Sequence, residues 1–166
     1  MIKIKWSQGN IMCQKKKVCF ISSSGGHLEQ IKQLKHVATK YEHYYVLPKN
    51  PSTVMFDEKK YLVGDFYRKK RIQFVYRFIF TAIQQLLIFI KEKPDVVITT
   101  GAGVVIPTCL YAHFFKKKLI YIESFARMKT LNKTAKLLYK YSDLFVVQWE
   151  QLLNIVPNAV YGGWIY

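Results

Sequence analysis

The segment VCFISSSGGHLE, residues 18–29, establishes the class of fold. An apolar run of β-branched and aromatic residues ends in serines and in the pair Gly25 and Gly26, and a helical pattern of apolar residues follows. This order predicts a strand, a tight loop and a helix. The glycines let the backbone approach a ligand, and N–H groups at a helix start favour an anion such as phosphate. The segment therefore predicts phosphate-group chemistry, with a simple tight turn as the alternative.

Apolar runs and helical patterns alternate along the rest of the chain. Strands are expected at 18–22, 44–47, 96–99, 119–123 and 144–147, with a weaker one at 60–63. Helices are expected at 27–41, 71–91, 104–115 and 133–141, with a shorter one after Trp149. Continuous apolar strands separated by helices predict an α/β fold, a Rossmann-like parallel sheet with helices on both faces.

Length and composition fit one domain with a sizeable core. The chain has 166 residues, of which 51% are hydrophobic. Residues 17–166 are expected to form this domain, and the polar, aperiodic residues 1–16 are expected to be a poorly ordered leader. The 26 basic and 10 acidic side chains give a net charge of +16. This charge predicts a polyanionic partner, either a nucleic acid, an anionic membrane or a phosphorylated substrate.

The predicted helix at 71–91 is apolar around most of its circumference. Its polar residues fall on one narrow stripe: Gln73, Arg77, Thr81, Gln84 and Gln85. Three interpretations compete, namely a buried core helix, a helix that spans a membrane and a helix that lies in the headgroup region. The polar stripe makes insertion across a bilayer costly, and the basic flank favours the interfacial interpretation. Membrane contact is therefore expected from Arg68, Lys69, Lys70, Arg71, Phe74 and Phe78.

Two further loops follow predicted strands at the same edge of the sheet. The segment TTGAGVVIP, residues 99–107, supplies Gly101 and Gly103 and lacks the third glycine of a dinucleotide site. It fits either a backbone cradle for a diphosphate or a capping turn. After the strand at 119–123, Glu123 and Ser124 are candidates to bind sugar hydroxyls, and Arg127 is a candidate to bind phosphate. The alternative is an internal Glu123–Arg127 ion pair.

Other kinds of site find little support in the sequence. The three cysteines, Cys13, Cys19 and Cys109, have no C-x-x-C spacing, so a metal site and a disulfide framework are not expected. No serine, histidine and aspartate follow a hydrolase order, and no cofactor is expected.

Four motifs carry a resemblance to a known family. They are SGGH at 24–27, TGAGV at 100–104, IESFAR at 122–127 and DLFVVQW at 143–149. From about residue 17 to 166, the chain resembles small bacterial polysaccharide-biosynthesis proteins. These are related to the membrane-anchoring subunit of the eukaryotic UDP-N-acetylglucosamine transferase for dolichol-linked sugars.

The resemblance implies the N-terminal, acceptor-binding half of a GT-B glycosyltransferase, with the UDP-sugar donor half on a separate protein. It implies a polyprenyl-diphosphate-linked saccharide as acceptor and a metal-independent transfer in capsule or exopolysaccharide assembly. His27 is then the candidate catalytic base. The acceptor and its diphosphate are expected to contact Ser24, Gly25, Gly26, Glu29, Gly101, Gly103, Glu123, Ser124 and Arg127.

The same resemblance implies a place and a partner for the protein. The eukaryotic relative has an N-terminal membrane anchor, and this sequence shows none, so a peripheral position on the cytoplasmic face of the cell membrane is expected. The partner is expected to contact Trp149, Trp164 and Tyr166, although the tail could instead fold back on its own sheet. Two other functions remain open, a non-catalytic scaffold for the donor-binding subunit and a nucleic-acid-binding module. Basic residues that adjoin apolar runs disfavour the latter, and no nucleic acid partner is expected.

Overall fold

The computed structural model of the protein describes residues 15–64 and 71–165. Most of the expected leader lies outside the described residues. So do Arg68, Lys69, Lys70 and Tyr166, as well as the side chain of Arg71. The predictions made for these residues therefore stay predictions.

The described residues form a parallel sheet with the strand order β3-β2-β1-β4-β5-β6-β7. Its strands are β1 (Lys17–Ile21), β2 (Glu42–Pro48), β3 (Lys60–Val63), β4 (Val96–Thr99), β5 (Lys118–Ile122), β6 (Leu144–Val147) and β7 (Val160–Tyr161). The sheet confirms the predicted Rossmann-like α/β fold, and each expected strand is present. The short strand β7 was not predicted, because its two residues carry no periodic pattern and pair only with β6.

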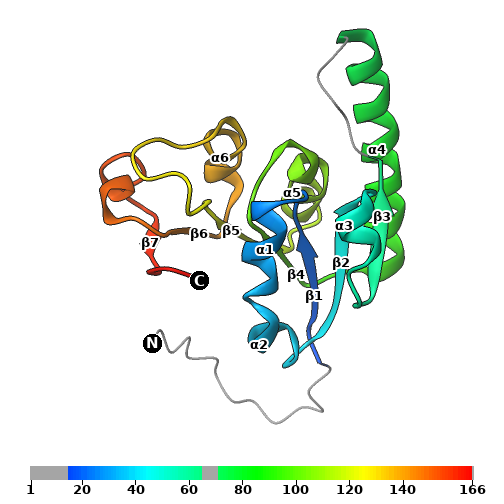
Figure 1. Cartoon of the computed structure of the whole chain (residues 1–166), viewed down its shortest axis with the longest axis horizontal. Coiled ribbons are helices and arrows are strands. Elements are labelled where there is room, and N and C mark those ends of the chain that lie inside the picture. The colour runs from blue at the N-terminus through cyan, green and yellow to red at the C-terminus, as the bar shows by residue number, and fades with distance from the viewer. Residues whose placement is uncertain (1–14, 65–70, 166) are drawn as a thin grey trace.

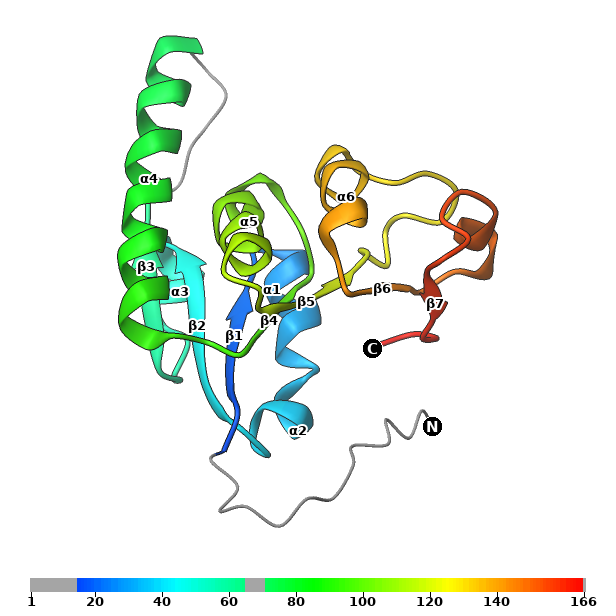
Figure 2. The same ribbon diagram turned by 180° about the vertical axis from the view of Figure 1, so that it is seen from behind.

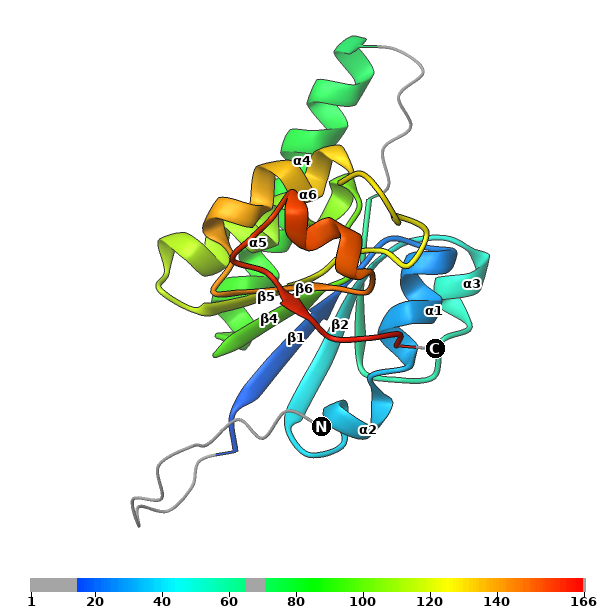
Figure 3. The same ribbon diagram turned by 90° about the vertical axis from the view of Figure 1, so that its left-hand side faces the viewer.

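Helices cover both faces of this sheet (Figure 3). One face carries α1 (Gly26–Lys32), α2 (Lys35–Ala38) and α3 (Pro51–Val54). The other face carries α4 (Arg71–Glu92), α5 (Ile106–Phe114), α6 (Lys133–Leu138) and the 3₁₀ helices η1 (Gly103–Val105), η2 (Tyr139–Tyr141) and η3 (Glu150–Asn154). Alternate residues of β1 point to opposite faces, so Phe20 packs in the cluster of Leu28 from α1, whereas Cys19 packs in the cluster of Cys109 from α5.

The single helix predicted at 27–41 is wrong, because the chain forms α1 and α2 with a turn between them. The N–H groups of Gln33 and Leu34 donate to carbonyls three residues back, at Gln30 and Ile31. This tighter turn interrupts the α-helical hydrogen bonds. The helices expected at 104–115 and 133–141 are likewise divided, since η1 precedes α5 and η2 follows α6.

Helix α4 directs Thr81, Gln84 and Gln85 of its polar stripe into the protein, whereas Arg77 is exposed. The side chain of Gln85 is buried, donates to the carbonyl of Val104 (2.8 Å) and accepts from the N–H and hydroxyl of Thr108 (3.1 and 2.8 Å). The Thr81 hydroxyl donates to the carbonyl of Gly64, whose N–H donates to Gln84. These three polar side chains therefore have partners within the domain. The side chain of Gln73 lies outside the described residues.

The outward face of α4 is apolar. It exposes Val75, Tyr76, Ile79, Phe80, Ile83, Leu87 and Ile90. Only 17% of the 18-residue window within Phe74–Glu92 is buried, and by length and composition this stretch is the one described helix that could cross a membrane. The interpretation of α4 as an ordinary core helix is therefore wrong. Its first turns project beyond the rest of the fold (Figures 1 and 2).

Candidate functional site

The site lies where β1 and β4 run side by side. From β1 the chain passes to α1 on one face of the sheet, and from β4 it passes to α5 on the opposite face. In open α/β sheets, ligands bind in the crevice beyond the strand ends at such a point. Two hydrogen bonds join the loops here, because the Nδ1 atom of His27 lies 2.7 Å from the carbonyl oxygen of Thr100 and the Thr100 hydroxyl donates to the carbonyl of His27 (2.8 Å).

His27 is held in a form suited to accepting a proton. The carbonyl of Thr100 can only accept, so the neutral ring carries its proton on Nδ1 and leaves Nε2 as the basic nitrogen. Burial lowers the pKa of His27 below 6.5, and the nearby charge of Arg127 lowers it further, while the hydrogen bond to Thr100 opposes both effects. The imidazole is therefore neutral at neutral pH.

The loop after β4 packs closely against His27. Gly101 has a φ of +102°, and a Cβ atom at this position would lie 2.6 Å from the hydroxyl oxygen of Tyr121 and 3.5 Å from Cε1 of His27. The next residue, Ala102, has a φ of +77°, which an L-residue adopts at a cost of about 1–3 kcal/mol. The backbone thus fits closely against His27 and Tyr121.

The loop after β1, by contrast, has free space around its backbone. Gly25 has a φ of +69°, and Cβ atoms built at Gly25 or Gly26 meet nothing within 4 Å. No side chain caps the start of α1. Both glycines are exposed, so a ligand has free access to this backbone.

A polar cleft of about 460 Å³ opens beside His27. Ser124, Ala126 and Arg127 come to it from the loop after β5. Its remaining lining comes from the loops at the starts of η1 and α6: Ala102, Gly103, Asn132, Lys133 and Thr134. The cleft therefore brings a neutral imidazole together with two cationic side chains, those of Arg127 and Lys133, which suits an anionic, hydroxyl-bearing ligand.

Glu123 lies behind this cleft and is fully buried. Its Oε1 atom accepts from the N–H of Ser124 (2.8 Å) and from Nδ2 of Asn132 (2.7 Å), and its Oε2 atom has no partner. Burial raises the pKa of this carboxyl group above its usual value. Within residues 15–64 and 71–165, no ion pair joins Glu123 to Arg127. Glu123 instead holds Asn132, whose side-chain oxygen accepts from the N–H of Ala135 and so caps α6.

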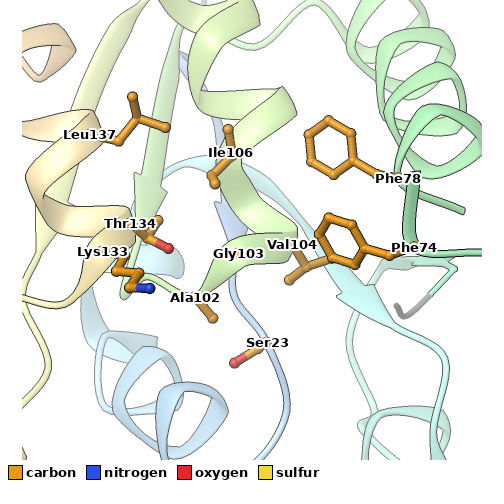
Figure 4. Close-up of a pocket in the computed structure, with 10 residues that line it drawn as sticks. All are labelled: Ser23, Phe74, Phe78, Ala102, Gly103, Val104, Ile106, Lys133, Thr134 and Leu137. Atoms are coloured by element: carbon orange, nitrogen blue, oxygen red, sulfur yellow. The ribbon is translucent and has the colours of Figure 1, made fainter. Parts of the chain in front are cut away.

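A second, mostly apolar cleft of about 350 Å³ adjoins the first (Figure 4). Phe74 and Phe78 of α4 form one side, Val104 and Ile106 lie in the middle, and Leu137 of α6 stands opposite. Four residues line both clefts: Ala102, Gly103, Lys133 and Thr134. The expected membrane-contact residues Phe74 and Phe78 thus face this cleft, on a different side of α4 from its outward apolar residues.

Other predicted site residues lie outside both clefts. Glu29 is exposed on α1 and pairs with Lys32 at 2.8 Å. Ser24 lies in the loop after β1, and like Gly25, Gly26 and Gly101 it lines neither cleft. Trp149 and Trp164 pack with Phe125, with ring centroids 5.0–5.5 Å apart, and Trp164 stays 62% exposed.

The sequence interpretation missed the contribution of α6 to the site. Asn132, Lys133 and Thr134 come at the start of a helix predicted to follow the third strand-end loop, and that position was their available signal. No group of three or more His, Cys, Asp or Glu side chains that could hold a metal ion occurs in the described residues.

Solved structures with this fold include sugar-nucleotide enzymes. MurG of Acinetobacter baumannii matches with a TM-score of 0.69 at 14% identity, over 82% of this chain and 42% of that one. UDP-N-acetylglucosamine 2-epimerase of Rickettsia bellii matches with a TM-score of 0.68 at 16% identity, over 88% and 43%. These matches establish a Rossmann-like fold, which this chain shares with less than half of each matched chain.

Curated relatives share sequence with part of the chain. The human UDP-N-acetylglucosamine transferase subunit ALG14 is 37% identical over 79 residues, 44% of this chain and 37% of the relative. The ALG14 subunit of Candida albicans is 35% identical over 107 residues, 61% of this chain and 47% of the relative. The chain thus spans under half the length of these relatives. The family described as oligosaccharide biosynthesis protein Alg14 like matches residues 68–165, more than half of the chain. The chain therefore belongs to the Alg14-like family of oligosaccharide biosynthesis proteins.

Proposed function

We propose that this chain is the acceptor-binding subunit of a two-protein glycosyltransferase. The donor-binding subunit holds a UDP-sugar, and this chain presents the hydroxyl of a saccharide linked to a polyprenyl diphosphate, undecaprenyl diphosphate in capsule or exopolysaccharide assembly. The observation that carries the proposal is the polar cleft at the meeting point of β1 and β4, which is lined by His27 and by two cationic side chains. The named function of the relatives, a transferase subunit, agrees with a chain that works together with another protein.

The transfer step assigns one role to each group. The acceptor hydroxyl gives its proton to Nε2 of His27, and its oxygen attacks the anomeric carbon of the donor sugar. The bond from that carbon to UDP breaks, and UDP leaves with the electron pair. Arg127 and Lys133 hold the acceptor's diphosphate, while Ser124 hydrogen-bonds its sugar hydroxyls.

The chain is further proposed to lie on the cytoplasmic face of the cell membrane as a peripheral protein. Helix α4 supports this position, because it turns Thr81, Gln84 and Gln85 toward the domain and a row of apolar side chains outward. A helix that packs along the domain in this way lies on a membrane surface more readily than across it. The net charge of +16 favours anionic headgroups.

Reconstitution tests the two-protein function. The purified chain with a UDP-sugar and a polyprenyl-diphosphate saccharide is expected to transfer no sugar, and addition of the donor-binding subunit is expected to start transfer. Robust transfer by this chain alone contradicts the two-protein proposal.

The scaffold alternative is favoured by Glu123, a predicted ligand contact that is fully buried, lines neither cleft and holds Ser124 and Asn132 within the protein. His27→Ala separates the two functions in a complex shown to be intact by gel filtration. Unchanged turnover establishes the scaffold, and loss of turnover establishes participation in the transfer.

A further inference from the structure

The two clefts adjoin, since they share four lining residues, and they differ in polarity. The polar cleft contains His27, Ser124 and Arg127, whereas the adjoining cleft is lined mainly by apolar side chains of α4, η1, α5 and α6. Lys133 and Thr134 border both clefts, and Figure 4 shows the Lys133 side chain reaching toward Ala102 at this border. A ligand that fills both clefts has a hydroxylated end, a negative charge at the border and an apolar chain.

We propose that the apolar cleft binds the first isoprene units of the lipid acceptor, next to its diphosphate. This inference rests on the proposed function, because it takes the acceptor to be a polyprenyl diphosphate. A cleft of about 350 Å³ lies at the lower end of the size range of small-molecule pockets, about 300–1,000 Å³, so it holds a short stretch of chain and leaves the remainder outside.

The geometry distinguishes this cleft from a membrane-contact surface. Phe74 and Phe78 are one helical turn apart, half-buried and on the side of α4 that faces α6. Tyr76 lies two residues after Phe74, and Phe80 lies two residues after Phe78. This spacing places them on the opposite side of the helix, and both are mostly exposed. One side of α4 therefore borders the lipid cleft and the other side is available to a bilayer.

The apolar cleft also explains why lysine stands at the border. The ammonium group of Lys133 lies at the end of a flexible stem, so it can meet a diphosphate whose chain enters the apolar cleft and whose sugar enters the polar one. When Lys133 holds the diphosphate in this way, the acceptor presents its sugar hydroxyls to Nε2 of His27. How deeply the isoprene units enter the apolar cleft thus determines how far the sugar extends into the polar cleft.

A series of soluble diphosphates tests the inference without membranes or turnover. Pyrophosphate and the dimethylallyl, geranyl and farnesyl diphosphates are titrated into the purified full chain by calorimetry, below their aggregation concentrations. We expect the dissociation constant to fall at least about tenfold between the dimethylallyl and farnesyl compounds, because each added carbon leaves water for the apolar cleft.

Variants on the two sides of α4 provide matched controls. Phe78→Ala is expected to remove most of this chain-length dependence and to keep the affinity for pyrophosphate, whereas Phe80→Ala on the outward side is expected to leave both unchanged. Leu137→Ala on α6, an exposed position whose substitution leaves the fold intact, is expected to act as Phe78→Ala does. The same loss in Phe80→Ala as in Phe78→Ala overturns the inference.

The outcomes separate this inference from the proposed function. Equal binding of pyrophosphate and all three prenyl compounds overturns the lipid cleft and leaves the diphosphate site standing. Absence of binding by every compound contradicts the proposed acceptor site itself.

Discussion

His27 and Thr100 are joined by two hydrogen bonds, each between the side chain of one residue and the main-chain carbonyl of the other. The ring Nδ1 of His27 lies 2.7 Å from the Thr100 carbonyl oxygen, and the Thr100 hydroxyl donates to the His27 carbonyl at 2.8 Å. These residues are 73 positions apart in the chain, on loops that leave neighbouring strands. The pair fixes the ring orientation and its tautomer before any ligand binds. A preset base of this kind reduces the reorganisation needed during proton transfer.

The first prediction concerns pH. Because burial lowers the pKa of His27 below 6.5, turnover by the reconstituted complex is expected to stay constant near neutral pH and to fall about tenfold per pH unit once the ring is protonated at lower pH. His27→Ala is expected to lower turnover about 10²–10⁴-fold. His36→Ala, at an exposed position on α2, serves as the control and should match the wild type. An acid limb that persists in His27→Ala contradicts the assignment.

The second prediction contrasts two glycines. Gly26→Ala meets open space, so the variant is expected to unfold in urea within about 0.5 kcal/mol of the wild type or to be slightly more stable. Gly26 adjoins His27 but lines neither cleft, so this variant tests the predicted contact of the glycine loop with the diphosphate. If the backbone at Gly26 binds the diphosphate together with Arg127 and Lys133, the new methyl group lowers the pyrophosphate affinity at least about tenfold. Gly101→Ala collides with the Tyr121 hydroxyl and has a φ of +102°, so a loss of about 1–3 kcal/mol of stability is expected. Normal binding by Gly26→Ala places the ligand elsewhere.

The third prediction concerns the buried carboxyl of Glu123. Its pKa is raised in the folded protein, chiefly by burial, so the folded state holds the proton more tightly than the unfolded state. The contribution of this group to stability is therefore full below pH 4.5 and declines as pH rises from there through the raised pKa. Glu123→Gln cannot ionise. Urea unfolding at pH 4.5 and 7.5 is expected to show that the free energy of unfolding of the variant rises relative to that of the wild type as pH increases. A difference in free energy that is the same at both pH values refutes the raised pKa.

Much of the fold follows from local patterns, and the exceptions depend on long-range contacts. The apolar runs that became β1 and β4 are buried on both sides, so they needed no context to be recognised. The break after α1 arises from two hydrogen bonds to carbonyls three residues back, a change that apolar spacing does not encode. Strand β7 exists through its pairing with Val146 and Val147 of β6.

The site was predictable where it follows strand ends and unpredictable where a helix approaches from elsewhere. The glycine loops and His27 come directly after strands, so parallel topology gathers them at one edge. Lys133 and Thr134 reach the site only because Glu123 and Asn132 hold the start of α6 beside those loops. In α4, Thr81 and Gln85 are buried while large apolar side chains are exposed, so its sequence alone could not show which side meets the domain.

The fourth prediction tests the outward face of α4. Ile83→Ser combined with Leu87→Ser removes exposed apolar side chains, so the fold is expected to keep its stability within about 0.5 kcal/mol per site. The fraction that floats with vesicles containing anionic lipid is expected to fall at least about tenfold, and wild-type flotation should weaken with salt. Ile155→Ser, an exposed substitution far along the chain, is the control. If the double variant floats as well as the wild type, another surface of the protein contacts the membrane.

The fifth prediction concerns the aromatic cluster at the C-terminal side of the sheet. Trp164 contacts Phe125 and Trp149, yet most of its surface is open, which is the usual state of an interface anchor before its partner binds. Trp164→Ala is therefore expected to weaken binding of the donor-binding subunit at least about tenfold and to leave pyrophosphate affinity unchanged.

Trp149→Ala differs because the Trp149 indole donates to the carbonyl of Phe125 (2.7 Å), in the loop that carries Ser124 and Arg127 into the polar cleft. This variant is expected to weaken partner and pyrophosphate binding together, since it releases the loop as well as the cluster. Phe114→Ala, at an exposed end of α5, should change neither affinity. Both affinities are measured by calorimetry on the same preparations. If Trp164→Ala binds the partner as tightly as the wild type, the partner interface does not include this cluster.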